Sequence, residues 1–220
     1  MKTFTELQEG VYDPNILKAF FMAGGPGSGK SYVVKRTTGG LGLKIVNSDD
    51  IFEKYLLDAI GTLDIREIDP EQRDRIRGRA KRVTAARQAN YIEGRLGLII
   101  DGTGKDFDKI KDQSTRLKQL GYDVHMIFVN TSLDTALERN AKRDRKVPES
   151  LVIKSWNDVQ KNIGKFSQYF RRNFIVVDNN DSEEDIMGPV FKQVRSLAMA
   201  KVQNPTGLKW IANELAMKRR

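Results

Sequence analysis

The chain has 220 residues, of which 39% are hydrophobic and 30% charged, a composition typical of globular proteins rather than disordered or membrane-embedded ones. It contains no cysteine, which excludes disulfides, thiolate metal sites and cysteine nucleophiles. Its apolar runs are far shorter than the roughly 20 residues that cross a bilayer. Residues 1–10 also lack the apolar core of a signal peptide, so we expect a cytoplasmic protein with no membrane partner.

The positive charge is unevenly distributed. The formal net charge is +9, and an excess of cations is found in three clusters, at residues 73–87, 139–146 and 218–220. Clustered cations favour polyanionic partners such as nucleotide phosphates or a nucleic-acid backbone. The structural alternative is that these cations lie on solvated helix faces and in a polar tail.

Short apolar segments alternate with segments of helical periodicity, which is typical of βαβ units on a parallel sheet. The expected strands are residues 18–23, 43–47, 96–101, 124–129 and 174–178. We therefore predict an α/β fold with a parallel five-stranded sheet flanked by helices. Residues 1–180 would form one domain and residues 181–220 a C-terminal helical extension.

The first helical segments lie before and after the third strand. Residues 73–95 are predicted to form one long helix with a weak apolar stripe, although Gly78 disfavours it. Residues 107–120 carry a regular apolar stripe. Asp106 is placed to cap this helix and Gly121 to stop it.

The later helices are marked by proline and glycine. A helix is expected to start near Pro148 and to end at Gly164. A further helix restarts at Gly188 after the last strand. Residues 204–207 (Asn-Pro-Thr-Gly) are expected to form a turn before a closing amphipathic helix.

The strongest motif follows the first expected strand and opens a helix. It is the segment Gly24-Gly25-Pro26-Gly27-Ser28-Gly29-Lys30-Ser31. Two glycines five positions apart, followed by Lys-Ser, form the phosphate-loop (P-loop) pattern, whose backbone N–H groups wrap around phosphates at a helix N-terminus. Lys30 would reach the β- and γ-phosphates and the Ser31 hydroxyl would bind Mg²⁺, so we expect ATP and Mg²⁺ as ligands.

Carboxylates follow the second and third strands, at the edge of the sheet where ligands of such folds bind. Asp49 is predicted to accept a hydrogen bond from an acceptor hydroxyl and to align it for attack, a role typically worth ~10² to 10⁴ in rate. Asp50 is equally well explained as a helix cap. Asp101 would line the acceptor site or, in the Walker B position, hold the magnesium through water.

A basic segment follows the fourth strand and its helix. Residues 139–146 carry five cations, including Arg139 and Arg143. Arginines on such a turn would suit a lid that closes over ATP and stabilises the charge of the transferring phosphoryl group. Surface salt bridges are the alternative explanation.

Taken together, these segments resemble the kinase module of phage-type polynucleotide kinases and, more loosely, the zeta-toxin kinases of the same P-loop group. The likeness extends over residues 18–165 and is carried by residues 24–31, 47–50 (Asn-Ser-Asp-Asp), 101–104 (Asp-Gly-Thr-Gly) and 139–148. It implies a P-loop NTPase fold of the nucleoside-kinase type. It also implies that Lys30 and Ser31 handle the donor phosphates and the metal.

The resemblance assigns the remaining roles by position. Asp49 corresponds to the base or aligner of the acceptor hydroxyl and Arg143 to the lid arginine. Asp101 and Thr103 would line the acceptor pocket.

One position departs from the polynucleotide-kinase pattern. Those kinases carry an arginine, which holds an acceptor phosphate, three residues after the aligning aspartate, but here that position is Phe52. Lys54 is the nearest cation and would take its place beside Asp50 in the acceptor site, although an ammonium does not reproduce a guanidinium fork.

Three functions follow from these patterns. The first is an ATP-dependent kinase that phosphorylates a hydroxyl of a nucleic acid or nucleotide. The second keeps this chemistry with a sugar nucleotide as acceptor, as in zeta toxins. The third is a nucleotide-gated module that binds nucleic acid without transferring phosphate.

Two other side chains are interpreted as structural. His125 is the only histidine and lies in the middle of an expected strand, so we expect it to be buried with its hydrogen bonds satisfied. Trp156 lies on a helical apolar stripe and is expected in the core. With one histidine and no cysteine, the chain has no zinc motif.

Overall fold

The computed structural model describes residues 10–63, 68–143, 147–180 and 187–218. In this part of the chain a five-stranded parallel sheet has the strand order β2-β3-β1-β4-β5. The strands are β1 (Lys18–Ala23), β2 (Lys44–Val46), β3 (Leu98–Asp101), β4 (Asp123–Asn130) and β5 (Phe174–Asp178). The predicted strands are therefore confirmed with small shifts of their ends, and β1 occupies the centre of the sheet.

Helices connect the parallel strands, as such crossovers require, and further helices follow the last strand. They are α1 (Lys30–Thr38), α2 (Ser48–Ile60), α3 (Pro70–Glu93), α4 (Phe107–Gln119), α5 (Leu133–Ala141), α6 (Glu149–Gln160), α7 (Ile163–Phe170), α8 (Met187–Met199) and α9 (Pro205–Lys218). The long helix α3 forms despite Gly78. Asp106 caps α4 by accepting a hydrogen bond from the Lys109 amide, as predicted.

Two helix boundaries differ from the prediction. Gly164 does not end a helix but lies in the first turn of α7, a separate helix that begins at Ile163. The expected turn at residues 204–207 is already helical from Pro205. Gly207 is tolerated there because it packs against the backbone of Gly121, where a side chain would overlap.

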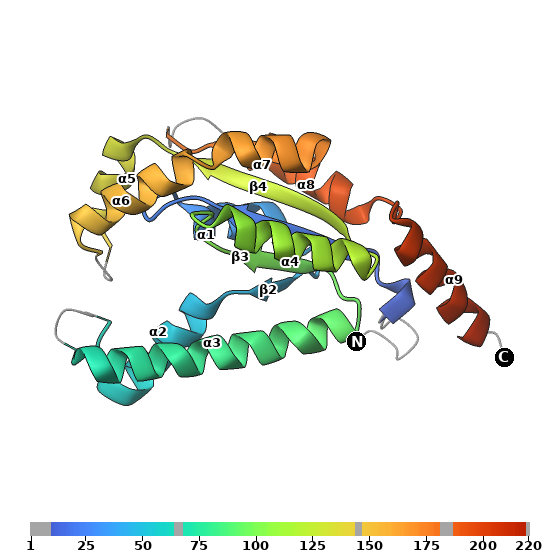
Figure 1. The fold of residues 1–220 in the computed structure, drawn as a ribbon, viewed down its shortest axis with the longest axis horizontal. Coiled ribbons are helices and arrows are strands. Elements are labelled where there is room, and N and C mark those ends of the chain that lie inside the picture. Colours follow the sequence, from blue (N-terminus) through green and yellow to red (C-terminus); the bar gives the residue numbers. More distant parts are fainter. Residues whose placement is uncertain (1–9, 64–67, 144–146, 181–186, 219–220) are drawn as a thin grey trace.

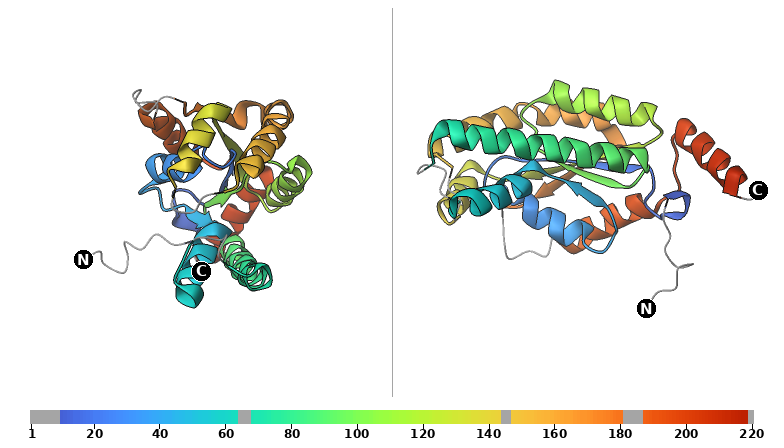
Figure 2. Two further views of the ribbon diagram at one scale, coloured as in Figure 1. Left: turned by 90° about the vertical axis from the view of Figure 1, so that its left-hand side faces the viewer. Right: turned by 90° about the horizontal axis from the view of Figure 1, so that it is seen from below.

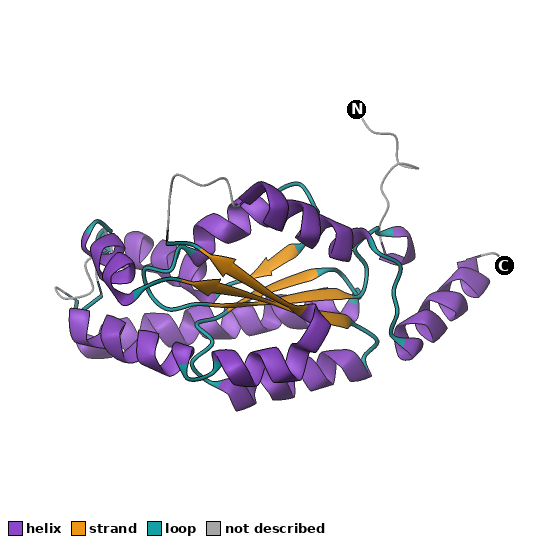
Figure 3. Cartoon of the chain, turned by 90° about the horizontal axis from the view of Figure 1, so that it is seen from above, coloured by secondary structure: helices purple, strands orange, loops and turns teal. Residues whose placement is uncertain are grey.

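Apolar side chains cover both faces of the sheet, because β1 is buried along its whole length. On one face Phe20 and Met22 pack against α1 and α8. On the other face Phe21 packs against α4, α6 and α7. Helices therefore lie on both sides of the sheet (Figure 1, Figure 3).

Helices α2 and α3 form a separate layer with a small apolar cluster of their own. It contains Phe52, Leu56, Ile68 and Ala80. The two helices run alongside each other below the main body in Figure 1. The layer joins the sheet where α2 follows β2 and where residues 91–92, near the C-terminal end of α3, pack against the main core.

The C-terminal segment contributes to the fold in two ways. Val194 and Ala198 of α8 belong to the buried cluster on the sheet, whereas α9 projects from the body (Figure 2). No helix among residues 10–63, 68–143, 147–180 and 187–218 has the length and hydrophobicity needed to cross a bilayer. The division of the chain at residue 180 stays a prediction.

Candidate active site

The P-loop lies between the end of β1 and the start of α1, so the predicted strand–loop–helix context is confirmed. The Gly24 amide donates a hydrogen bond to the Thr103 carbonyl oxygen at 2.9 Å, which ties the loop to the segment after β3. Thr103 is therefore next to the P-loop, and its place in an acceptor pocket stays a prediction. Gly25 packs against the backbone of Trp156 on α6.

Two glycines of the loop have conformations and surroundings that only glycine fits. Gly27 (φ 79°) and Gly29 (φ 82°) are in the left-handed region. A Cβ on Gly27 would overlap the carbonyl group of Ala136, and one on Gly29 would overlap the side-chain amide of Asn179. The loop therefore has its curved shape because neighbouring segments pack directly on its backbone.

Side chains that lie outside the motif in the sequence stabilise the P-loop through hydrogen bonds. Asn179, directly after β5, donates a hydrogen bond from Nδ2 to the Ser28 carbonyl oxygen at 2.8 Å. Thr131, after β4, donates to the same oxygen at 3.3 Å. Arg139 on α5 donates from Nη1 to the Asn179 carbonyl oxygen at 2.7 Å, so this arginine lies beside the segment that supports the P-loop, and its part in ATP binding stays a prediction.

Lys30 is the electrostatic centre of the site. Its ammonium donates to the Gly24 carbonyl oxygen at 2.7 Å. Burial lowers the pKa of Lys30. The charges of Asp101 and Asp49 act to raise it, and the charge of Arg143 lowers it further. Charged groups from three other segments of the chain therefore act on the pKa of Lys30.

Asp101 lies at the end of β3, beside Met22 of β1. Its Oδ1 atom is buried and has no hydrogen-bond partner among the described residues, and the same holds for the Ser28 hydroxyl. Burial raises the pKa of Asp101, and the charge of Lys30 opposes this rise. A buried carboxylate oxygen that lacks a donor fits a site completed by a cation or a bound ligand.

Asp49 lies in the first turn of α2. Its backbone amide donates to the Asn47 side chain at 2.8 Å, which caps the helix and fixes the direction of that turn. Asn47 also donates to Asp50 Oδ1 at 2.9 Å. The helix cap is therefore Asn47 and not Asp50, which lies in the first turn of α2. Lys54, one turn later, is exposed.

Arg77 on α3, which was not among the predicted site residues, lies next to Asp49. Its Nη2 atom lies 3.1 Å from Asp49 Oδ1. Its guanidinium also lies 4.7 Å from the centre of the Phe52 ring. The position at which polynucleotide kinases carry an arginine is thus occupied by a ring, and the guanidinium next to the aspartate comes from another helix.

The basic segment after α5 is described only in part. Arg143 is exposed, and its backbone amide donates to the Asn140 carbonyl oxygen at 3.3 Å. Residues 144–146 of the predicted lid lie outside the described residues. Within the described part, Lys142 pairs with Glu138 on the same helix at 2.5 Å, so one of the cations follows the salt-bridge alternative.

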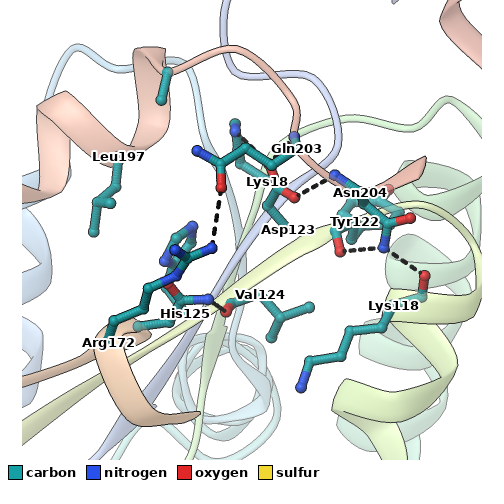
Figure 4. Close-up of a pocket in the computed structure, with 12 residues that line it drawn as sticks. Lys18, Lys118, Tyr122, Asp123, Val124, His125, Arg172, Leu197, Gln203 and Asn204 are labelled. Carbon is teal, nitrogen blue, oxygen red and sulfur yellow. Dashed lines mark hydrogen bonds and ion pairs between the residues drawn. The ribbon is translucent and has the colours of Figure 1, made fainter. Parts of the chain in front are cut away.

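A cavity of about 450 Å³ lies at the opposite end of the strands, away from the P-loop (Figure 4). In it Asp123 pairs with Lys18 at 2.7 Å and accepts hydrogen bonds from the backbone amides of Gln203 and Asn204 at 2.9 Å each. These bonds attach the segment before α9 to the sheet. The cavity is thus lined by a structural polar network.

His125 lines the same cavity. It is buried as predicted, with 5% of its surface exposed, but the expectation that its hydrogen bonds are satisfied is wrong, because neither ring nitrogen has a partner in the described structure. The ring instead stacks on Phe20, with 4.9 Å between the ring centres. Burial and the nearby charge of Lys18 lower the pKa of His125 to about 4.

The fold matches several solved structures. A candidate kinase from Chloroflexus aurantiacus superposes with a TM-score of 0.57 at 18% identity, over 81% of this chain and 97% of that chain. The Pnkp1/Rnl/Hen1 RNA repair complex gives 0.54 at 20% identity, over 69% and 47%. The AvrRxo1-ORF1:AvrRxo1-ORF2 complex gives 0.59 at 13% identity, over 84% and 65%. This chain therefore spans less than two thirds of the matched chain in each of the last two structures.

A search among curated proteins found no relative. A family model for zeta toxins, in contrast, matches residues 6–187, which is most of the chain and includes the P-loop, Asp49 and Asp101. The parallel sheet, the P-loop and the kinase-like solved structures agree with this match. The chain therefore belongs to the zeta toxin family and has the fold of P-loop kinases.

Proposed function

We propose that this protein is an ATP- and Mg²⁺-dependent kinase that transfers the γ-phosphate to a hydroxyl of a nucleic acid or nucleotide. The observation that carries the proposal is the P-loop itself, whose buried Lys30 donates to the Gly24 carbonyl oxygen at 2.7 Å and has a pKa on which the charges of Asp101, Arg143 and Asp49 all act. A carboxylate for the hydroxyl, a carboxylate for the metal and two cations for the phosphates are the parts that phosphoryl transfer needs.

The donor nucleotide binds along the P-loop. Backbone N–H groups of residues 27–31 surround the β-phosphate, and the start of α1 adds the positive end of its dipole. Lys30 exchanges its bond to the Gly24 carbonyl oxygen for the phosphates. Arg139 and Arg143 approach from the end of α5 and stabilise charge on the phosphoryl oxygens.

Mg²⁺ fits the residues at this site. The Ser31 hydroxyl at the start of α1 and the Asp101 carboxylate, whose Oδ1 lacks a partner in the described structure, would hold it together with phosphate oxygens. So few protein ligands suit Mg²⁺, which keeps water and phosphate in its shell. The ion would neutralise charge on the phosphates. No group of three or more metal-binding side chains occurs in the part of the chain that the structure describes.

Asp49 acts on the acceptor. Its carboxylate accepts a hydrogen bond from the acceptor O–H and orients the oxygen toward the γ-phosphorus. A bond forms between this oxygen and the γ-phosphorus, the bond from the γ-phosphorus to the bridging oxygen breaks, and ADP leaves. The hydroxyl proton passes to Asp49. Asp50, Lys54, Asp101 and Thr103 are assigned to the surrounding acceptor site.

A sugar nucleotide is the second candidate acceptor. The observation that favours it is the zeta-toxin family match, because the zeta-toxin kinases that this sequence resembles phosphorylate sugar nucleotides. The basic helix α3, with seven cations against one carboxylate between Arg73 and Arg87, favours a longer anionic acceptor. Both candidates share the roles given to Asp49 and Lys30.

The test is a transfer assay with γ-labelled ATP and a panel of oligonucleotides, nucleotides and sugar nucleotides. Transfer to oligonucleotides should weaken with added salt, with a log–log slope of roughly −0.7 per phosphate contacted. Transfer only to a sugar nucleotide would select the second candidate. Label released only as free phosphate would contradict both and favour a nucleotide-gated binding module.

A further inference from the structure

Arg77 forms an unusual bridge between the two helices of the separate layer. It is 28 residues from Asp49 along the chain, yet its Nη2 atom lies 3.1 Å from Asp49 Oδ1. Its guanidinium packs over Phe52, whose side chain is almost fully buried, at 2% exposure. The ring is a fixed support, so the guanidinium is held next to the carboxylate.

The neighbouring arginines of α3 behave differently. Arg75 pairs with Glu71 one turn earlier on the same helix, at 3.4 Å. Arg79 lies over the Tyr55 ring of α2 at 4.8 Å, the same kind of contact that Arg77 makes with Phe52. Arg77, in contrast, pairs with Asp49 on the other helix of the layer.

Stability does not explain this placement. The side chains of Arg77 and Asp49 are 41% and 44% exposed, and ion pairs open to water contribute little to the folded state. The exposure does leave room for a ligand beside both groups. A guanidinium has five N–H donors in one plane, so it binds Asp49 and a further anion at the same time.

We propose that Arg77 selects the acceptor: its guanidinium binds a phosphate of the acceptor while Asp49 receives the hydroxyl. The inference rests on the proposed function and narrows its substrate class. Because the two groups are in contact, the acceptor carries its phosphate on the same sugar as the reacting hydroxyl. Nucleoside 3′-phosphates, the ends of nucleic acids and nucleotide-linked sugars all have this chemistry.

The experiment compares two matched pairs of acceptors. One pair is adenosine and adenosine 3′-phosphate, and the other is N-acetylglucosamine and its uridine diphosphate conjugate. The wild-type protein is expected to prefer the phosphorylated member of one pair, which also identifies the source of the phosphate. Arg77→Ala should raise KM for that member about 10- to 100-fold, the loss expected for one charge-assisted hydrogen bond, and change the other member little.

Two variants separate recognition from structure. Arg77→Lys keeps the positive charge but loses the planar guanidinium, so it should recover part of the preference for the phosphorylated acceptor. Arg79→Ala removes the matched stacking arginine and should leave the preference unchanged. The thermal unfolding of each variant shows whether the α2–α3 layer is intact.

The outcomes are distinct. Equal losses on both members of a pair in Arg77→Ala would overturn the inference, because Arg77 would then only position Asp49. Absence of transfer to any acceptor by the wild type would instead refute the proposed function. Calorimetric titration of the ADP-bound protein with the same compounds then decides the inference separately: it holds if Arg77→Ala weakens binding of the phosphorylated member alone, and fails if binding is unchanged.

Discussion

The side chain of Asn179 donates a hydrogen bond to the backbone carbonyl oxygen of Ser28, at 2.8 Å and across 151 residues of sequence. The residue directly after the last described strand thereby supports the nucleotide-binding loop. Arg139 binds the carbonyl oxygen of the same asparagine. The shape of the P-loop therefore depends on the position of the segment after β5 as well as on the glycines of the loop.

Replacing Asn179 by alanine should weaken ATP binding about tenfold, because the Ser28 carbonyl group loses its shorter hydrogen bond. The expected loss of stability is about 1–2 kcal/mol. Asn173→Ala is the matched control, since its side chain donates to the Val124 carbonyl oxygen at 3.1 Å at the other end of the sheet. Fluorescence titration with a nucleotide analogue should show a change only in Asn179→Ala; equal affinities would disprove the support by Asn179.

Gly27→Ala should abolish ATP binding, because its Cβ would overlap the Ala136 carbonyl group and displace the loop. The left-handed backbone alone costs roughly 1–2 kcal/mol. Gly40→Ala separates the two effects, since Gly40 has nearly the same φ, 77°, and no atom within 4 Å of the added Cβ. Gly40→Ala should lose stability and keep its affinity for ATP. If both variants bind ATP normally, the packing account of the loop is wrong.

Asp101→Asn should raise the Mg²⁺ concentration needed for half-maximal activity at least tenfold, since a neutral amide is a poor ligand for this ion. Asp108→Asn removes the same charge from the exposed face of α4 and should have no such effect. Burial raises the pKa of Asp101, so its ionised form is lost as the pH falls through this raised value. The magnesium requirement of the wild type should therefore rise in acid, and a flat dependence would contradict the role.

His125 should make the protein less stable in mild acid. Its pKa is about 4 in the folded state and about 6.5 in the unfolded chain, so between these values the unfolded chain binds more protons. The free energy of unfolding therefore decreases as the pH falls below 6.5, by about 3 kcal/mol in total once the pH is below 4. His125→Phe keeps a ring packed against Phe20, and its free energy of unfolding should lack this decrease in acid. Urea unfolding at pH 7.5 and 5 measures it; parallel losses in both proteins would exclude it.

Local patterns account for much of what could be predicted. The strands follow from runs of apolar residues, and the P-loop follows from a motif whose backbone geometry needs glycine at fixed positions. Asp49 was identified because the carboxyl ends of parallel strands share one edge of the sheet. Each of these inferences depends on residues close together in sequence.

Long-range contacts explain most of what was missed. Arg77 was one of seven cations in a helix whose charge pattern does not indicate which of them faces α2. Asn179 lies 151 residues from its partner. Gly164 was interpreted as a helix stop and Gly207 as part of a turn, yet both lie within helices, because the low helix propensity of glycine amounts to only about 1 kcal/mol. Whether the ring nitrogens of His125 find hydrogen-bond partners depends on residues that are distant in the sequence, so it could not be predicted.

The central claim is that the γ-phosphate of ATP on the P-loop faces Asp49. Asp49→Asn keeps the size of the side chain and removes the base, and Asp58→Asn removes an exposed carboxylate near the end of the same helix. With γ-labelled ATP and the best acceptor, Asp49→Asn should bind ATP within about threefold of the wild type and transfer phosphate ~10² to 10⁴ more slowly. Asp58→Asn should transfer normally. Transfer by Asp49→Asn at the wild-type rate would contradict the account.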